Sequence, residues 1–104
     1  MKAKFLNTML VVTILLLSSC GEKTDVVESG TYEGTIKEVE PSKTEIYVET
    51  DDNKTLELYF TDLTELTRDG TAVDFSVLEE GMRVEVEVKK EGKRLDPVSV
   101  KVLE

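Results

Sequence analysis

Apolar and polar residues alternate along most of the chain after residue 30, which is the period expected of β-strands. The clearest run is residues 82–89, MRVEVEVK, in which every second side chain is apolar. Shorter runs of the same kind cover residues 30–40, 44–50 and 54–60, and alternating valines fill residues 98–102. The pattern predicts five short strands and an all-β fold.

The runs at 44–50 and 54–60 are predicted to pair as an antiparallel hairpin. Pairing Val48 with Leu56 places the apolar residues of both strands on one face and leaves a three-residue loop that ends at Asn53. The last position of such a loop is usually left-handed, a conformation that Asn tolerates. The face opposite the core would then carry Tyr47, Tyr59, Glu45, Glu49 and Glu57.

The remaining elements complete a small barrel. Gly34 permits strong curvature in the first strand, and Asp74 is a predicted N-cap for one helical turn that Gly81 closes. In the last hairpin, a two-residue turn at Glu91-Gly92 requires a bulge, which we place at Asp96-Pro97.

Five antiparallel strands with a helical turn between the third and fourth are typical of an OB-type barrel. Over residues 30–104 the sequence also resembles the small OB-like domains of exported bacterial proteins. The resemblance implies an all-β, five-stranded OB-like antiparallel barrel, and it carries over no catalytic residue. The segments that carry it are GTIKEVE (34–40), Phe60-Thr61 with Thr67, FSVLEEG (75–81), VEVEV (84–88) and VSVKV (98–102).

The N-terminus has the three parts of a secretory signal: two early lysines, a mostly apolar run from Phe5 to Leu17, and small residues before a cleavage point. Leu17-Ser18-Ser19-Cys20 resembles the lipobox of bacterial lipoproteins, which implies that Cys20 is lipidated and becomes the mature N-terminus. The sequence therefore predicts a signal peptide (1–19), a lipidated Cys with a flexible tether (20–29) and the barrel (30–104).

The resemblance implies a cell-envelope protein that is anchored to the membrane by its lipid. Because Gly21 and not Asp follows the cysteine, the outer membrane is predicted if the host is Gram-negative. Without residues 1–19 the chain keeps 11 basic and 22 acidic side chains. This excess of acids excludes a nucleic-acid partner, since phosphate binding depends on Lys and Arg, and favours a cationic partner or a cation.

The composition argues against an enzyme. The chain has no His, and Cys20, its single cysteine, is assigned to lipid, so the usual nucleophile and general-base pairs are missing. No cofactor is predicted. The acids are also numerous enough that no carboxylate pair is singled out for acid-base chemistry.

Two binding hypotheses remain. The first is a binding or scaffolding module that recruits another envelope component through Tyr47 and Tyr59 with their acidic neighbours; the simpler alternative is that these tyrosines only support strand pairing. The second is a site for a divalent cation or a small cationic ligand. Its candidate ligands are Asp51, Asp52 and Glu57, or the acids of residues 62–74, which are Asp62, Glu65, Asp69 and Asp74. The first set lacks the Gly and Glu of an EF-hand loop.

Overall fold

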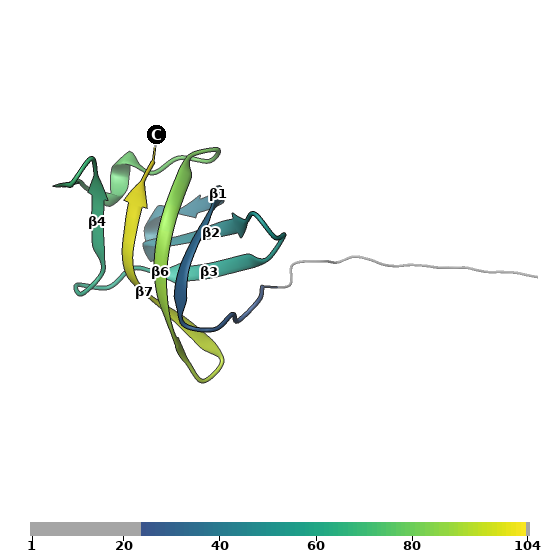
Figure 1. Cartoon of the computed structure of the whole chain (residues 1–104). Coiled ribbons are helices and arrows are strands. Elements are labelled where there is room, and N and C mark those ends of the chain that lie inside the picture. Colours follow the sequence, from purple (N-terminus) through teal and green to yellow (C-terminus); the bar gives the residue numbers. More distant parts are fainter. Residues whose placement is uncertain (1–23, 104) are drawn as a thin grey trace, which may run out of the picture.

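Seven strands form one mixed sheet in the computed structural model, which describes residues 24–103 (Figure 1). Their order across the sheet is β3-β2-β1-β6-β7-β4-β5. Within residues 24–103, no helix has the length and apolar character that crossing a membrane requires. The elements are β1 (Gly30–Glu40), the 3-10 helix η3 (Pro41–Lys43), β2 (Glu45–Thr50), β3 (Thr55–Tyr59), β4 (Glu65–Arg68), β5 (Thr71–Ala72), the 3-10 helix η4 (Phe75–Val77), β6 (Arg83–Glu91) and β7 (Arg94–Val102).

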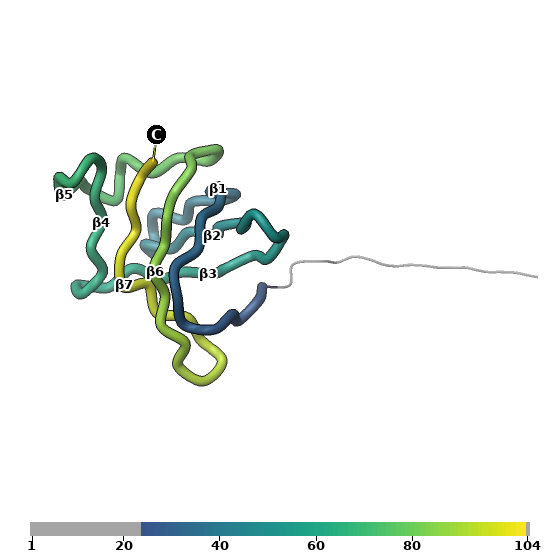
Figure 2. The backbone as a smooth tube through the Cα atoms, viewed as in Figure 1, coloured from purple at the N-terminus to yellow at the C-terminus, as the bar shows by residue number. Residues whose placement is uncertain are grey.

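The all-β fold is confirmed, but the predicted five-stranded antiparallel barrel needs two corrections. The segment after β3 contains two further strands, β4 and β5, joined by a turn in which Asp69 and Gly70 both have positive φ. Strand β4 pairs with β7 in the parallel direction, and the sheet is open, with β3 and β5 at its edges (Figure 2). The predicted helical turn lies at η4, where the Asp74 side chain makes no capping hydrogen bond.

The predicted β2–β3 hairpin is confirmed in register and in loop. Val48 pairs with Leu56, and Ile46 pairs with Leu58. The loop residue Asn53 has a φ of 67°, the left-handed conformation expected at this position. All four paired apolar side chains are fully buried, so the parity of the two strands fixes which face meets the core.

The predicted turn of the β6–β7 hairpin is wrong by one residue. Glu91 pairs with Arg94, so the turn is Gly92-Lys93, with Gly92 (φ 65°) at the first central position, where type II′ turns require glycine. The register shift in this hairpin skips Val98, next to the bulge predicted at Asp96-Pro97. As a result Pro97 is buried and Val98, which was expected to face the core, is exposed.

Strand β1 is shared between β2 and β6, and it bends. Its register with β2 shifts between Ile36 and Glu38, and Gly34 brings it very close to β2. A Cβ at Gly34 would lie 2.4 Å from the carbonyl oxygen of Glu49, so only glycine fits. The bent sheet closes over one core of Ile36, Ile46, Val48, Leu56, Leu58, Leu66, Leu78, Val84, Val86, Val88, Leu95, Val100 and Val102.

Residues 24–29, the described part of the predicted flexible tether, contact the domain. The Asp25 amide donates to the Thr55 carbonyl oxygen (2.7 Å), and the Thr55 amide donates to Asp25 Oδ2 (2.9 Å). Val27 packs against the core, and the Lys90 amide donates to Ser29 Oγ (2.8 Å). The segment therefore lies along β3 and β6. Cys20 and the predicted signal peptide lie outside the described residues.

The contact at Gly34 predicts that Gly34→Ala destabilises the domain by about 2 kcal/mol or more, because the added methyl group meets β2 backbone that cannot move aside. Urea unfolding would measure the change, with Thr31→Ala at an exposed position of the same strand as the control. A Gly34→Ala variant within about 0.5 kcal/mol of that control would contradict this account of the β1 bend.

Candidate functional site

The β2–β3 pairing assembles a cluster of acids and tyrosines on the sheet face opposite the core. Glu45 pairs with Tyr59, and Tyr47 pairs with Glu57. Because side chains alternate along each strand, all four project to the same side of the hairpin. We call this group, Glu45, Tyr47, Glu57 and Tyr59, the Glu–Tyr cluster. Its members are four of the five residues predicted for the acidic aromatic face.

The position of Glu45 differs from the prediction. It was expected on an accessible outer surface, yet it is 0% exposed. Neither of its carboxylate oxygens has a hydrogen-bond partner among the described residues. An ionised carboxylate in such surroundings is costly, so a proton or a bound cation is needed to balance its charge.

Glu57 accepts hydrogen bonds from both tyrosines. Tyr59 Oη donates to Glu57 Oε2 at 3.0 Å, and Tyr47 Oη donates to the same oxygen at 3.3 Å. The hydrogen bond to Glu57 raises the pKa of Tyr59 to about 12, while burial is the main cause that raises the pKa of Tyr47. Both phenols therefore stay protonated and hold Glu57 in place.

The two carboxyl groups titrate in opposite directions. Burial raises the pKa of Glu45, and the neighbouring Glu57 carboxyl raises it further. The interaction with the Glu45 carboxyl is the main cause that lowers the pKa of Glu57. The hydroxyls of Tyr59 and Tyr47 and the charge of Lys43 lower it further. A single proton is therefore held on Glu45 to higher pH than on an ordinary glutamate, and the cluster then carries one negative charge.

The cluster borders a hollow of about 280 Å³ on the surface. Glu57 and Tyr59 form one wall, residues 24–26 form another, and residues 93–95 at the start of β7 form the third. Strand β3 contacts β7 across the bend of the sheet. The N-terminal segment and the β6–β7 hairpin thus frame the accessible side of the Glu–Tyr cluster.

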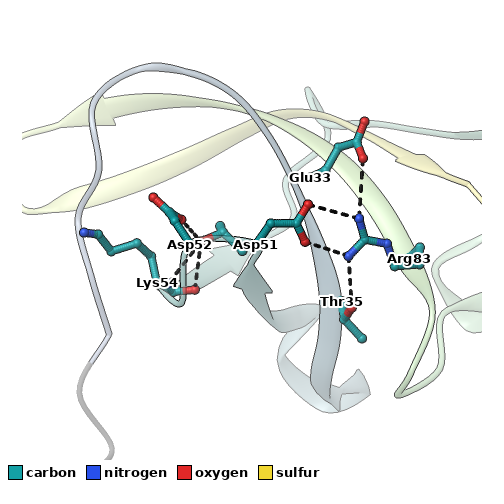
Figure 3. A network of polar contacts seen from close by, with 7 residues as sticks. Glu33, Thr35, Asp51, Asp52, Lys54 and Arg83 are labelled. Carbon is teal, nitrogen blue, oxygen red and sulfur yellow. Dashed lines mark hydrogen bonds and ion pairs between the residues drawn. The ribbon is translucent and has the colours of Figure 1, made fainter.

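Glu49 and Asp51, two other predicted site residues, are engaged elsewhere. Glu49 pairs with Lys37 at 3.3 Å and lies opposite Thr55, outside the Glu–Tyr cluster. Asp51 receives two hydrogen bonds from Arg83, at 2.9 and 3.3 Å, and this guanidinium also reaches Glu33 and Thr35 (Figure 3). The hydrogen bond from Arg83 lowers the pKa of Asp51. The ion pair between these two residues links the β2–β3 loop to β6.

The predicted metal sets are not assembled among residues 24–103. Asp52 accepts a hydrogen bond from Thr50 at the end of β2, whereas Glu57 accepts hydrogen bonds from the two tyrosines. Asp62 follows β3, Glu65 begins β4, and Asp69 stands in the β4–β5 turn. The described residues contain no group of three or more His, Cys, Asp and Glu side chains that could hold a metal ion.

Comparison with known proteins gives a fold and no family. No protein-family model matches the sequence, and neither does any curated protein. Among solved structures, the chain is similar to a variant of Escherichia coli CusF with Cu(II), with a TM-score of 0.59, 14% identity, and coverage of 74% of this chain and 94% of that one. It is also similar to CusF with Ag(I) from the same organism, with a TM-score of 0.58, 14% identity and the same coverage.

A third similar structure is that of metal-free E. coli CusF, with a TM-score of 0.55 and 14% identity over 82% of this chain and all of the other. At such low identity the likeness shows that the chain has the fold of CusF. It does not show which residues of this chain bind anything.

The burial of Glu45 predicts a pH dependence that Glu45→Gln removes. A folded-state pKa above the ordinary value of 4.5 means that this side chain stabilises the fold at low pH, and that the contribution is lost as pH rises through the raised pKa. As the pH rises from about 4.5 through the raised pKa, the wild type should therefore lose stability relative to Glu45→Gln. Unfolding in buffer with a metal chelator measures the difference.

Glu49→Gln, on the same strand and face but outside the Glu–Tyr cluster, is the matched control for the loss of a glutamate charge. Parallel stability curves for the wild type and Glu45→Gln over this range would show that Glu45 titrates as an exposed glutamate does, against the geometry described above.

Proposed function

We propose that this protein is a non-catalytic, lipid-anchored protein of the cell envelope that binds a cation at the Glu–Tyr cluster. The observation that carries the proposal is the fully buried Glu45 carboxyl, which finds no hydrogen-bond partner among residues 24–103 and lies beside a second carboxyl, that of Glu57. Lipid at Cys20 and the envelope location rest on the lipobox-like sequence, and the absence of catalysis rests on the composition.

A cation would replace the proton on Glu45. With that proton gone, the two carboxylates carry two negative charges, and the phenol oxygens of Tyr47 and Tyr59 add neutral donors beside Glu57. Binding would therefore release a proton when Glu45 starts out protonated, and affinity would rise with pH. The surrounding acidic chain favours cations over anions at this surface.

The ligand atoms favour a hard cation. Copper and silver in their monovalent states prefer thiolate, thioether and imidazole ligands. The chain has no His, and Met82, the methionine among the described residues, packs against the core away from the cluster. The Ag(I) and Cu(II) named with the similar CusF structures thus support cation binding on this fold, while the oxygen atoms here suit Ca²⁺ or Mg²⁺.

The site should be weak. Ca²⁺ takes six to eight oxygen ligands, and the cluster supplies only two carboxylates and two phenols, so water has to complete the shell. We expect dissociation constants of roughly 10⁻⁴ to 10⁻³ M, the range of extracellular calcium modules. Recruitment of a protein through an exposed acidic platform is less well supported, because Glu45 is buried and both tyrosine hydroxyls are turned to Glu57.

Calorimetric titration with Ca²⁺ and Mg²⁺ tests the proposal. The wild type should bind one ion per chain, with proton release below neutral pH that is detected by repeating the titration in buffers of different ionisation enthalpy. Glu45→Gln should weaken binding about tenfold or more and abolish the proton release, since one of the two charges is gone.

Glu49→Gln should bind as the wild type does, because Glu49 lies outside the cluster. Saturable binding that Glu45→Gln leaves unchanged would show that the ion binds outside the Glu–Tyr cluster. Failure of both ions to bind would overturn the proposal. Tighter binding of Ag⁺ than of Ca²⁺ would contradict the assignment of oxygen ligands.

A further inference from the structure

Large apolar side chains gather on one side of the domain. The described residues contain five exposed large hydrophobic side chains, and four of them, Val26, Tyr59, Leu63 and Val98, line two hollows that share Tyr59, Arg94 and Leu95. The larger hollow measures about 800 Å³. The fifth side chain, Leu103, borders a separate hollow beside the β4–β5 turn. We call the four clustered residues the apolar face.

Leu63 is held at this face by a fixed turn. Its side chain is 86% exposed, yet its amide donates to Thr61 Oγ1 (3.1 Å). Thr64 Oγ1 donates to the Pro97 carbonyl oxygen (2.9 Å), which joins the turn to β7. Val98 is exposed next to it because the β7 bulge turns Pro97 inward. The backbone thus presents two aliphatic side chains to solvent in a defined place, an arrangement typical of interaction surfaces.

The described chain begins beside this face. Thr24 and Val26 line the smaller hollow with Tyr59, and Figure 1 shows the β6–β7 hairpin and the start of the described chain at the lower side of the domain, with the C-terminus at the upper side. Only three residues separate Thr24 from Cys20. Even a fully extended chain places Cys20 within about 14 Å of Thr24. A lipid on Cys20 would therefore hold this face close to the bilayer.

The charges around the apolar face cancel in part and leave a small excess of acids. Lys89 pairs with Glu91 at 3.2 Å, and Arg94 pairs with Asp96 at 2.8 Å. Asp62 also lines the larger hollow, and Lys93 lines the smaller one together with the acids Asp25 and Glu57. Because acids exceed bases here, zwitterionic headgroups suit this face better than anionic ones, with tyrosine at the level of the membrane interface.

We infer that the apolar face docks on the surface of the bilayer that holds the lipid anchor, with Leu63 and Val98 inserted among the lipids. This inference rests on the lipid-anchored part of the proposed function. Two aliphatic side chains are too few for stable binding from solution, so docking depends on the high local concentration that the anchor provides. The hollow beside the Glu–Tyr cluster would then open next to the membrane surface.

Hydroxyl-radical footprinting of the native lipoprotein in phosphatidylcholine vesicles tests the inference, because side-chain oxidation detected by mass spectrometry reports solvent access without added labels. Leu63 and Leu103 are both exposed leucines, so each chain contains its own control. We expect Leu63 to be oxidised several-fold less than Leu103 in vesicles. In Val98→Asp, which stays anchored, the difference should largely disappear.

Equal oxidation of the two leucines in the anchored wild type, or an unchanged ratio in Val98→Asp, would overturn the docking. Failure of the anchor is recognised separately, because the mass of the N-terminal peptide shows whether Cys20 carries lipid. If it does not, the free Cys20 thiol of the same full chain is coupled to a maleimide lipid in the same vesicles, and the ratio of the two leucines still decides the question.

Discussion

The close approach of β1 to β2 at Gly34 is the constraint on which the rest of the structure depends. Strand β1 pairs with both β2 and β6, so its bend sets the angle between the two halves of the sheet. The bend brings β3 into contact with β7, although three strands separate them in the sheet order. That contact encloses the core and brings the β6–β7 hairpin to the hollow beside Glu57.

The burial of Glu45 sets the chemistry of the Glu–Tyr cluster. On a flat hairpin, Glu45 would project into water as its strand parity suggests. Here it is fully buried, between Glu40 of β1 and Tyr59 of β3, and its oxygens have no hydrogen-bond partner in the described chain. Buried polar groups without partners are rare in proteins and often mark a functional position. The two tyrosines fix Glu57, and in the proposed function Glu45 is the group that would exchange a proton for a cation.

The sequence was sufficient for the β2–β3 hairpin, but it placed the β6–β7 turn one residue too early, missed the β4–β5 hairpin and failed where distant segments meet. The alternation of apolar residues and the left-handed Asn53 predicted the β2–β3 register, and with it the shared face of Glu45, Tyr47, Glu57 and Tyr59. Strands β4 and β5 were missed although Asp69-Gly70 is a strong hairpin signal, because so short a run gives little periodicity. The burial of Glu45 could not be predicted, because the alternation of side chains along a strand shows which face a residue lies on but not which other residues cover it.

The measurement that tests the central claim most directly is a carbon-detected NMR titration of the glutamate carboxyl groups, with and without Ca²⁺. The account predicts that Glu45 titrates at clearly higher pH than the ordinary glutamate value of 4.5, and that saturating Ca²⁺ moves the Glu45 titration to lower pH. A Glu45 carboxyl that titrates near its ordinary value of 4.5 and does not respond to the cation would contradict the account.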